Sequence, residues 1–122
     1  MYIQVNIGRN FVPDRFNPTG GTLSDLDWGE FKNDIVNNLV ATVLTDSADV
    51  SQENWDKVLS QVEIHNGQGS YEGITEESCH ISIFVPVGLS EKSLSDFRSY
   101  LFNLKKEYSQ DTIALLIGSE LI

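Results

Sequence analysis

CHISIFVPVGLSEKSLSDFRSYLFNLKKEY, residues 79–108, decides the fold, because a strand pattern gives way to a helix pattern within it. Ile81, Ile83 and Val85 occupy every second position, so they share one face of a strand that runs from Cys79 to Val85. Proline and glycine follow directly and end this strand. The segment therefore predicts a half-buried strand that leads through a short connection into a helix.

The second half of the segment has the three- and four-residue spacing of an amphipathic helix. Ser90 predicts its N-cap, and Glu91 lies in the first turn, where free backbone amides favour negative charge. Residues 112–117, TIALLI, then form an uninterrupted apolar run, which predicts a strand inside a sheet. The apolar stripe of the helix consists of Leu94, Phe97, Leu101, Leu104 and Tyr108.

Toward the N-terminus the same two patterns occur again. Residues 2–7 alternate and predict a half-buried strand. Residues 8–22 contain three glycines, two prolines and two asparagines, so we expect a long ordered loop there. Ser24 then predicts the N-cap of a helix that runs to about Leu44.

Residues 51–78 allow more than one interpretation. Ser51 can cap a short helical turn, but from Val58 to His65 apolar and polar positions alternate, and we prefer a strand there. Residues 67–78, GQGSYEGITEES, would then join two antiparallel strands as an enlarged hairpin loop, because a minimal turn needs only about two to five residues.

The predicted order is strand, helix, strand, strand, helix, strand. This order predicts an α+β fold with a four-stranded, mostly antiparallel sheet and two helices on one face, as in ferredoxin-like proteins. A chain of 122 residues suits a single domain, residues 1–122. The second face of the sheet would carry Gln4, Asn6, His80, Ser82 and Phe84. Its aromatic content, with Tyr100 and Phe102 flanking the helical stripe, favours a homo-oligomer.

The formal net charge is −10, from eighteen carboxylates and eight bases. Eight acidic residues lie between Asp25 and Asp56, with only Lys32 against them. Such a surface repels nucleic acids, so no nucleic-acid partner is expected. No apolar run has the length of about 20 residues that a membrane helix needs. The single cysteine, Cys79, cannot form an internal disulfide, which fits a cytoplasmic protein.

His65, His80 and Cys79, with Glu63 nearby, resemble a metal cluster on paper. Side chains at positions 79 and 80 point to opposite sheet faces, however, and no paired metal-ligand spacing is present. We therefore expect neither a metal nor a cofactor. The tripeptide His80-Ile81-Ser82 matches half of a two-histidine phosphoesterase motif, but no second such tripeptide occurs.

The glycine-rich stretch is the best candidate for a binding site. Its glycines let backbone amides approach a ligand, and Tyr71 between them could stack on a planar base. Glu76 and Glu77 could accept hydrogen bonds from ribose hydroxyls or an exocyclic amine. The alternative is an ordinary hairpin tip. The predicted site consists of Gly69, Ser70, Tyr71, Glu72, Gly73 and Glu76.

An anionic ligand also needs cations. Arg9 and Arg15 lie in the first loop, and Arg98 is the only arginine beyond them. Arg98 sits beside the apolar stripe of the second long helix, where it could pack its stem or hold a phosphate with its guanidinium. We assign it the phosphate-binding role.

With its size, its element order and the Gly-Ser-Tyr-Glu-Gly stretch followed by Glu-Glu-Ser, the chain resembles phage-encoded anti-Thoeris proteins. These proteins sequester cyclic ADP-ribose-type signals without cleaving them, and some also capture cyclic oligonucleotides. The resemblance implies a non-enzymatic, oligomeric binder of a small nucleotide-derived ligand in an infected bacterial cell. It assigns base stacking to Tyr71 and phosphate binding to Arg98.

Two other functions stay open. The acidic surface suits a protein-binding inhibitor of a host defence complex, of the anti-CRISPR kind. A small phosphoesterase built around His80 is the third candidate.

Overall fold

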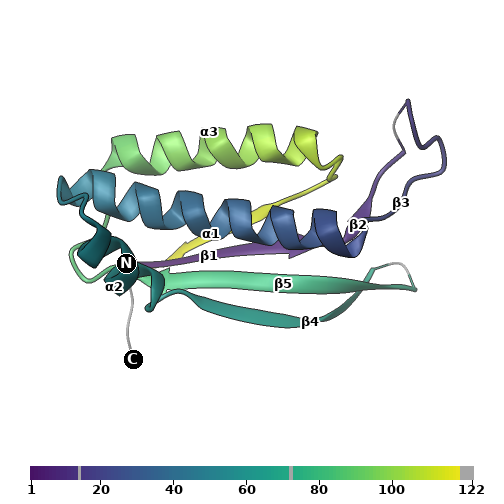
Figure 1. Cartoon of the computed structure of the whole chain (residues 1–122). Coiled ribbons are helices and arrows are strands. Elements are labelled where there is room, and N and C mark those ends of the chain that lie inside the picture. Colours follow the sequence, from purple (N-terminus) through teal and green to yellow (C-terminus); the bar gives the residue numbers. More distant parts are fainter. Residues whose placement is uncertain (14, 72, 119–122) are drawn as a thin grey trace.

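The computed structural model describes residues 1–13, 15–71 and 73–118 of the chain. Two long helices lie side by side on one face of a four-stranded antiparallel sheet (Figure 1). This is the predicted α+β fold with the ferredoxin-like order. Its main elements are β1 (Tyr2–Gly8), α1 (Asp25–Ser47), α2 (Gln52–Leu59), β4 (Glu63–Tyr71), β5 (Ile74–Phe84), α3 (Glu91–Glu107) and β6 (Ala114–Gly118).

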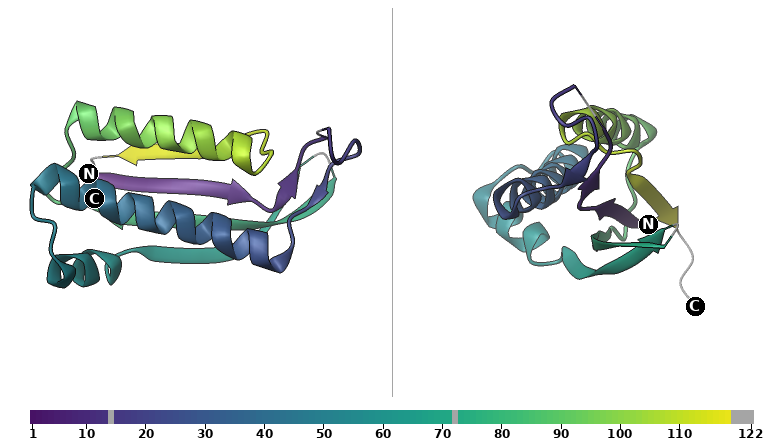
Figure 2. Two further views of the ribbon diagram at one scale, coloured as in Figure 1. Left: turned by 45° about the horizontal axis from the view of Figure 1, so that its top comes forward. Right: turned by 90° about the vertical axis from the view of Figure 1, so that its right-hand side faces the viewer.

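The strands are ordered β4-β5-β1-β6, so the first strand lies next to the last. β1 pairs with β5 from Tyr2–Phe84 to Gly8–Ser78, and with β6 from Tyr2–Gly118 to Asn6–Ala114. Figure 2 shows the same layers from two further sides, with the helices on one side of the sheet. None of the helices in the described ranges is long and apolar enough to cross a membrane.

The helices begin where the sequence predicts. The Ser24 hydroxyl accepts from the Asp27 amide at 3.1 Å, and the Ser90 hydroxyl accepts from the Ser93 amide at 3.2 Å. Each cap satisfies a backbone N–H that the first helical turn leaves free. α1 runs to Ser47, slightly beyond the expected end near Leu44, and stops where Ala48 takes a left-handed conformation with φ 56°.

The core lies between the helices and the inner face of the sheet. Ile3, Val5 and Ile81 on the sheet are fully buried against Phe31 of α1 and Phe97 of α3. These positions are the apolar stripes and alternating strand residues of the sequence, so periodicity alone locates most of the core. The phenol ring of Tyr108 stacks on Phe31 with centroids 4.5 Å apart.

Tyr100 belongs to the packing between the two long helices. Its hydroxyl donates to the backbone carbonyl of Asp34 at 3.1 Å. Burial, with the nearby Asp34 carboxylate, raises the pKa of Tyr100 to about 12. Tyr100 therefore fills a gap within one chain, whereas Phe102 remains 57% exposed.

Two local predictions are wrong. Residues 52–59 form α2, capped by the Ser51 hydroxyl, and the strand that we placed from Val58 starts only at Glu63. The alternating stretch is short, so its preference for a strand is weak. The cap and the i to i−4 hydrogen bonds stabilise a helix there more strongly. Within the predicted loop 8–22, Asn10–Phe11 (β2) pairs with Gly21–Thr22 (β3).

The glycine-rich stretch is not an enlarged loop. Gly67, Gly69 and Ser70 lie in β4, paired with Ser78, Glu76 and Thr75 of β5, and the pairing continues to Tyr71–Ile74. The two strands form a long ribbon that extends past the rest of the sheet (Figure 1). Cross-strand hydrogen bonds compensate for the low strand propensity of glycine. Strand propensity is a weak and context-dependent signal.

The position of the last strand also differs from the prediction. β6 is an edge strand rather than an inner one, and its Leu116 and Ile117 are 51% and 37% exposed. An apolar run indicates that a strand contacts other apolar groups. Packing on one face of the sheet is enough to provide such contacts, so the run does not require an inner position. The face of the sheet away from the two long helices carries Gln4, Asn6, His80, Ser82 and Phe84, as predicted, although Ser82 is buried there.

Candidate functional site

The ribbon places the predicted hairpin residues at one end of the molecule. Gly73 has a positive φ of 79°, the left-handed conformation that a tight turn requires and that glycine adopts without strain. Glu72 and the side chain of Tyr71 lie outside the described part of the structure. The predicted stacking role of Tyr71 therefore stays a prediction.

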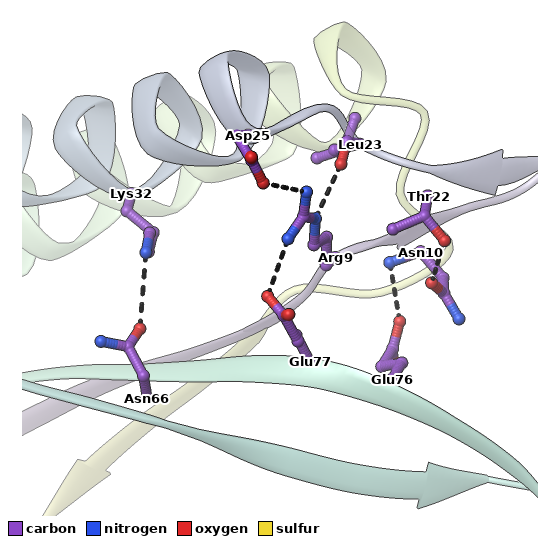
Figure 3. A network of polar contacts seen from close by, with 9 residues as sticks. All are labelled: Arg9, Asn10, Thr22, Leu23, Asp25, Lys32, Asn66, Glu76 and Glu77. Carbon is purple, nitrogen blue, oxygen red and sulfur yellow. Dashed lines mark hydrogen bonds and ion pairs between the residues drawn. The ribbon is translucent and has the colours of Figure 1, made fainter.

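Glu76 is fixed by a contact with the first loop. Its Oε2 accepts from the backbone N–H of Asn10 at 2.8 Å (Figure 3). The carboxylate lies across the end of β1, and a Cβ on Gly8 would meet its Oε2 at 2.8 Å. Glycine at position 8 is therefore what lets this side chain reach Asn10. One carboxylate oxygen of Glu76 is engaged, and Oε1 has no recorded hydrogen bond within the described residues.

Glu77, the neighbour of Glu76 in β5, meets Arg9. The guanidinium of Arg9 donates to Glu77 Oε2 at 2.9 Å, to Asp25 Oδ1 at 2.7 Å and to the Leu23 carbonyl at 2.7 Å (Figure 3). Hydrogen bonds to Glu77 and Asp25 raise the pKa of Arg9 above its ordinary value. Arg9 thus joins three segments of the chain and has a structural role instead of a free charge for a ligand.

A hollow of about 600 Å³ lies beside the ribbon, and we call it the hairpin hollow. Residues that follow β1 and residues that precede β6 form its other walls, and sequence reasoning did not single them out. Most of them come from loops and the others from the short strand β2, and the spatial neighbours of such segments depend on the whole fold. The lining consists of Gly8, Asn10, Phe11, Val12, Ile74, Glu76, Gln110, Asp111 and Thr112.

Arg98 lies in a second hollow of about 390 Å³, between α3 and β6, which we call the α3–β6 hollow. No acidic side chain lines it, whereas Arg98 and Lys105 both do. Within the part of the chain that the structure describes, the guanidinium of Arg98 has no recorded hydrogen bond or ion pair. The lining consists of Arg98, Leu101, Phe102, Lys105, Thr112, Ile113, Leu115 and Ile117.

Phe102 supplies an aromatic surface to the α3–β6 hollow. The ammonium groups of Lys106 and Lys105 lie 4.5 Å and 5.9 Å from its ring centroid. Cations over the ring face add positive potential to a surface that already holds Arg98. This side of α3 therefore gathers three of the eight bases of a strongly acidic chain.

The two hollows adjoin, because Thr112 lines both of them. Glu76 borders one and Arg98 borders the other, so the fold brings these two predicted site residues to neighbouring depressions. They do not touch each other among the recorded contacts of the described residues. A ligand that uses both must extend past Thr112 at the start of β6.

The two histidines face each other on the uncovered side of the sheet, where His65 pairs with His80 across β4 and β5. His65 Nε2 lies 3.4 Å from Glu63 Oε2, in an exposed position. Cys79 is fully buried on the other face, and burial raises the pKa of its thiol. No group of three potential metal ligands occurs among residues 1–13, 15–71 and 73–118.

Comparisons with known proteins add little to this description of the site. No protein-family model and no curated protein matches the chain. Among solved structures, the chain is similar to a phage SAM lyase in its apo state, with a TM-score of 0.49. The identity is 18%, over 93% of this chain and 75% of the lyase. Nothing about the ligand or activity of this chain follows from a likeness at that level.

Proposed function

We propose that this chain is a non-enzymatic binding protein that sequesters a small nucleotide-derived ligand of the cyclic ADP-ribose class. The observation that supports this function best is the α3–β6 hollow, where Arg98 and Lys105 line a surface without a carboxylate. The resemblance to phage anti-Thoeris proteins points to the same ligand class. The proposed setting is the cytoplasm of an infected bacterium, where capture of the signal would block defence.

Electrostatics favours this hollow as the place for a phosphate. With a formal charge of −10, most of the surface repels an anion, so an anionic ligand is drawn to the few sites where bases outnumber acids. The guanidinium of Arg98 can hold a phosphate through two parallel hydrogen bonds, and Lys105 adds a second charge.

The rest of a nucleotide has matching surfaces nearby. The ring of Phe102 is half exposed, and an exposed aromatic face can stack on a base. Past Thr112, the free oxygen of Glu76 in the hairpin hollow can accept a hydrogen bond from a ribose hydroxyl or an exocyclic amine. The two volumes, about 390 and 600 Å³, lie within the ordinary range for small-molecule sites.

Thermal unfolding with a panel of cyclic ADP-ribose isomers tests the proposal. A ligand at about 100 times its Kd stabilises the folded state by about 2.7 kcal/mol, which corresponds to a rise in Tm on the order of 10 °C. We expect such a rise for the wild type, and its loss in Arg98→Ala. A Tyr71→Ala variant measures the contribution of the hairpin tip in the same assay.

Lys92→Ala is the matched control for this experiment. It also removes one positive charge from α3, but Lys92 pairs with Asp96 at 2.8 Å and does not line the hollow. The control should keep the full rise in Tm. Equal shifts in Arg98→Ala and the wild type would contradict the proposed site, and recovery of a cleaved ligand would show an enzyme instead of a binder.

A specific observation also favours a second function, the acidic protein-binding inhibitor. Asp27, Glu30 and Glu107 line one hollow of about 440 Å³ beside the start of α1, and basic side chains of a partner could enter it. A partner bound there should dissociate as NaCl is raised, should be lost on Glu30→Gln, and should tolerate Arg98→Ala. Binding that depends on Arg98 would exclude this second function.

A further inference from the structure

A hollow of about 450 Å³ lies where the end of α2 meets the ends of β1, β4 and β5 (Figure 1), and we call it the α2–sheet hollow. It opens at the end of the sheet that is remote from the turn of the ribbon. Ser82, which is buried, lies at its base. The hollow shares no lining residue with the α3–β6 hollow or the hairpin hollow, so it is a separate feature of the molecule.

Two aromatic side chains line the α2–sheet hollow. Tyr2 and Phe84 are direct partners on the adjacent strands β1 and β5, so their rings leave the same face of the sheet close together. They are 39% and 38% exposed. Among the recorded contacts of the described residues, no other ring and no basic side chain packs on either of them. Both ring surfaces are therefore available to a ligand.

The charge at the α2–sheet hollow is negative. Among the described residues that line it, Glu63 alone is charged. Its Oε2 lies 3.4 Å from His65 Nε2, and its Oε1 has no recorded hydrogen bond within the described residues. Ser60, the C-cap of α2, also lines the hollow, and the C-terminal end of a helix carries a partial negative charge. Lys57, in the last turn of α2, does not line it.

We propose that the α2–sheet hollow binds a small organic cation of the quaternary ammonium class. Such a cation is attracted to the faces of aromatic rings, and the Glu63 carboxylate adds a direct attraction between opposite charges. A quaternary ammonium has no N–H group that needs a hydrogen bond, so aromatic walls suit it better than they suit a strongly hydrated primary ammonium. The net charge of −10 attracts cations to the molecule as a whole, and the two rings beside a carboxylate favour this place.

Size and charge favour a free small molecule over the headgroup of a lipid. The volume of about 450 Å³ lies within the ordinary range for small-molecule sites. A choline headgroup would bring its phosphate to the same place, and no base among the described lining residues could pair with that phosphate. The ligand is also opposite in charge to the one proposed for the α3–β6 hollow, so this inference does not rest on the proposed function.

An NMR titration of the full chain with choline chloride tests the proposal. The ionic strength is held constant with NaCl, so that screening does not change during the titration. We expect the ring signals of Tyr2 and Phe84 to shift in a saturable way, with a Kd on the order of 1 mM. The neutral isostere of choline, in which carbon replaces the charged nitrogen, has the same shape without the charge. It should bind at least about tenfold more weakly.

Two variants test the residues that are assigned to the cation. Glu63→Gln keeps the shape of the side chain and removes its charge, so it should weaken choline binding by about fivefold. Phe84→Leu keeps an apolar side chain and removes the ring face, and it should weaken binding as well. Glu53→Gln is the matched control for charge, because Glu53 is exposed in the first turn of α2 and outside the lining. Phe16→Leu is the control for loss of an exposed ring elsewhere, and both controls should bind choline as the wild type does.

Equal affinities for choline and its neutral isostere would overturn the proposal, and so would a Glu63→Gln variant that binds choline as the wild type does. Because the Glu63 side chain is 69% exposed, this variant should keep the urea midpoint of the wild type, and a loss of binding is then not a loss of fold. Co-sedimentation of the chain with phosphatidylcholine vesicles would overturn the assignment to a free cation. None of these outcomes depends on nucleotide binding, so the test is separate from that of the proposed function.

Discussion

At the scale of single residues, Asp46 connects the end of α1 to the start of α3. Its Oδ1 accepts from the hydroxyls of Ser90 and Ser93, both at 2.7 Å, and from the Ser90 amide at 3.2 Å. The sequence predicts Ser90 as a cap, because the cap is a local signal. Asp46 is 44 residues away from Ser90, and no local pattern in the sequence relates the two.

In an Asp46→Asn variant, the free energy of unfolding should depend less on pH in the acid range than it does in the wild type. The Ser90 hydroxyl, then the Ser93 hydroxyl and the Ser90 amide, hold the pKa of Asp46 below its ordinary value. A carboxyl whose pKa is lower in the folded state stabilises the fold above its unfolded pKa, and this contribution is lost as the pH falls through the folded pKa. Asp46→Asn should therefore lower the midpoint of urea unfolding at neutral pH.

The difference between wild type and variant should shrink as the pH falls from about 5 to about 2. Urea titrations at a series of pH values measure it. Asp49→Asn is a suitable control, because Asp49 lies nearby on the exposed loop after α1 and no recorded contact involves its carboxylate within the described residues. A difference that stays constant with pH would contradict the role given to the Asp46 carboxylate.

At the scale of elements, the β4–β5 ribbon shows where sequence reasoning succeeds and where it stops. The two long helices α1 and α3 and the strands β1 and β5 follow from periodicity and caps, and most of the core follows with them. The glycines of β4 weaken a local strand signal, and only pairing with β5 reveals the strand. β6 was placed inside the sheet because its sequence is apolar, but strand order is a property of the whole chain.

For the candidate site, the sequence predicts Glu76 and Arg98 but not the residues that surround them. Asn10 of β2 and the loop residues Gln110 and Thr112 reach the hairpin hollow from segments distant in sequence, and only the fold brings them together. Lys105 shows a signal that could have been used. It lies seven residues after Arg98, which is two helical turns, so both bases lie on one side of α3.

The ribbon should tolerate alanine at Gly69 in β4 but not at Gly73 in its turn. Gly73 has a φ of 79°, so Gly73→Ala should lower the free energy of unfolding by about 1 kcal/mol, the cost of a left-handed alanine. Gly69→Ala is the control, since Gly69 lies in β4 and a Cβ there meets no atom within 4 Å. Urea unfolding of both variants compares the two positions. Equal effects would contradict the turn conformation.

At the scale of the whole molecule, the distribution of charge has more consequences than any single ion pair. The acidic residues of α1 lie on one layer, and bases gather beside the α3–β6 hollow. Composition alone gives the value of −10 but not this distribution, because the distribution depends on where the fold places α1, α3 and β6. The proposed ligand site follows from this arrangement.

Added salt should stabilise the folded chain. Compact packing brings like charges together, and ions screen their repulsion over a Debye length of about 10 Å at 0.1 M. We expect the urea midpoint to rise with NaCl. KCl should act equally, which separates screening from binding of a particular cation. A midpoint that falls with salt would show that pairs such as Arg9–Asp25 matter more than the net charge.

Among the described residues no strand pairs with the outer edge of β6, and this edge bears on the solubility of the protein. An edge strand with exposed Leu116 and Ile117 is a template on which further chains can add strand by strand. Mutual repulsion of the molecules at neutral pH opposes such growth. Near the isoelectric point of about 4.4 the repulsion vanishes, so precipitation should begin there, and this short strand is where we expect aggregates to nucleate.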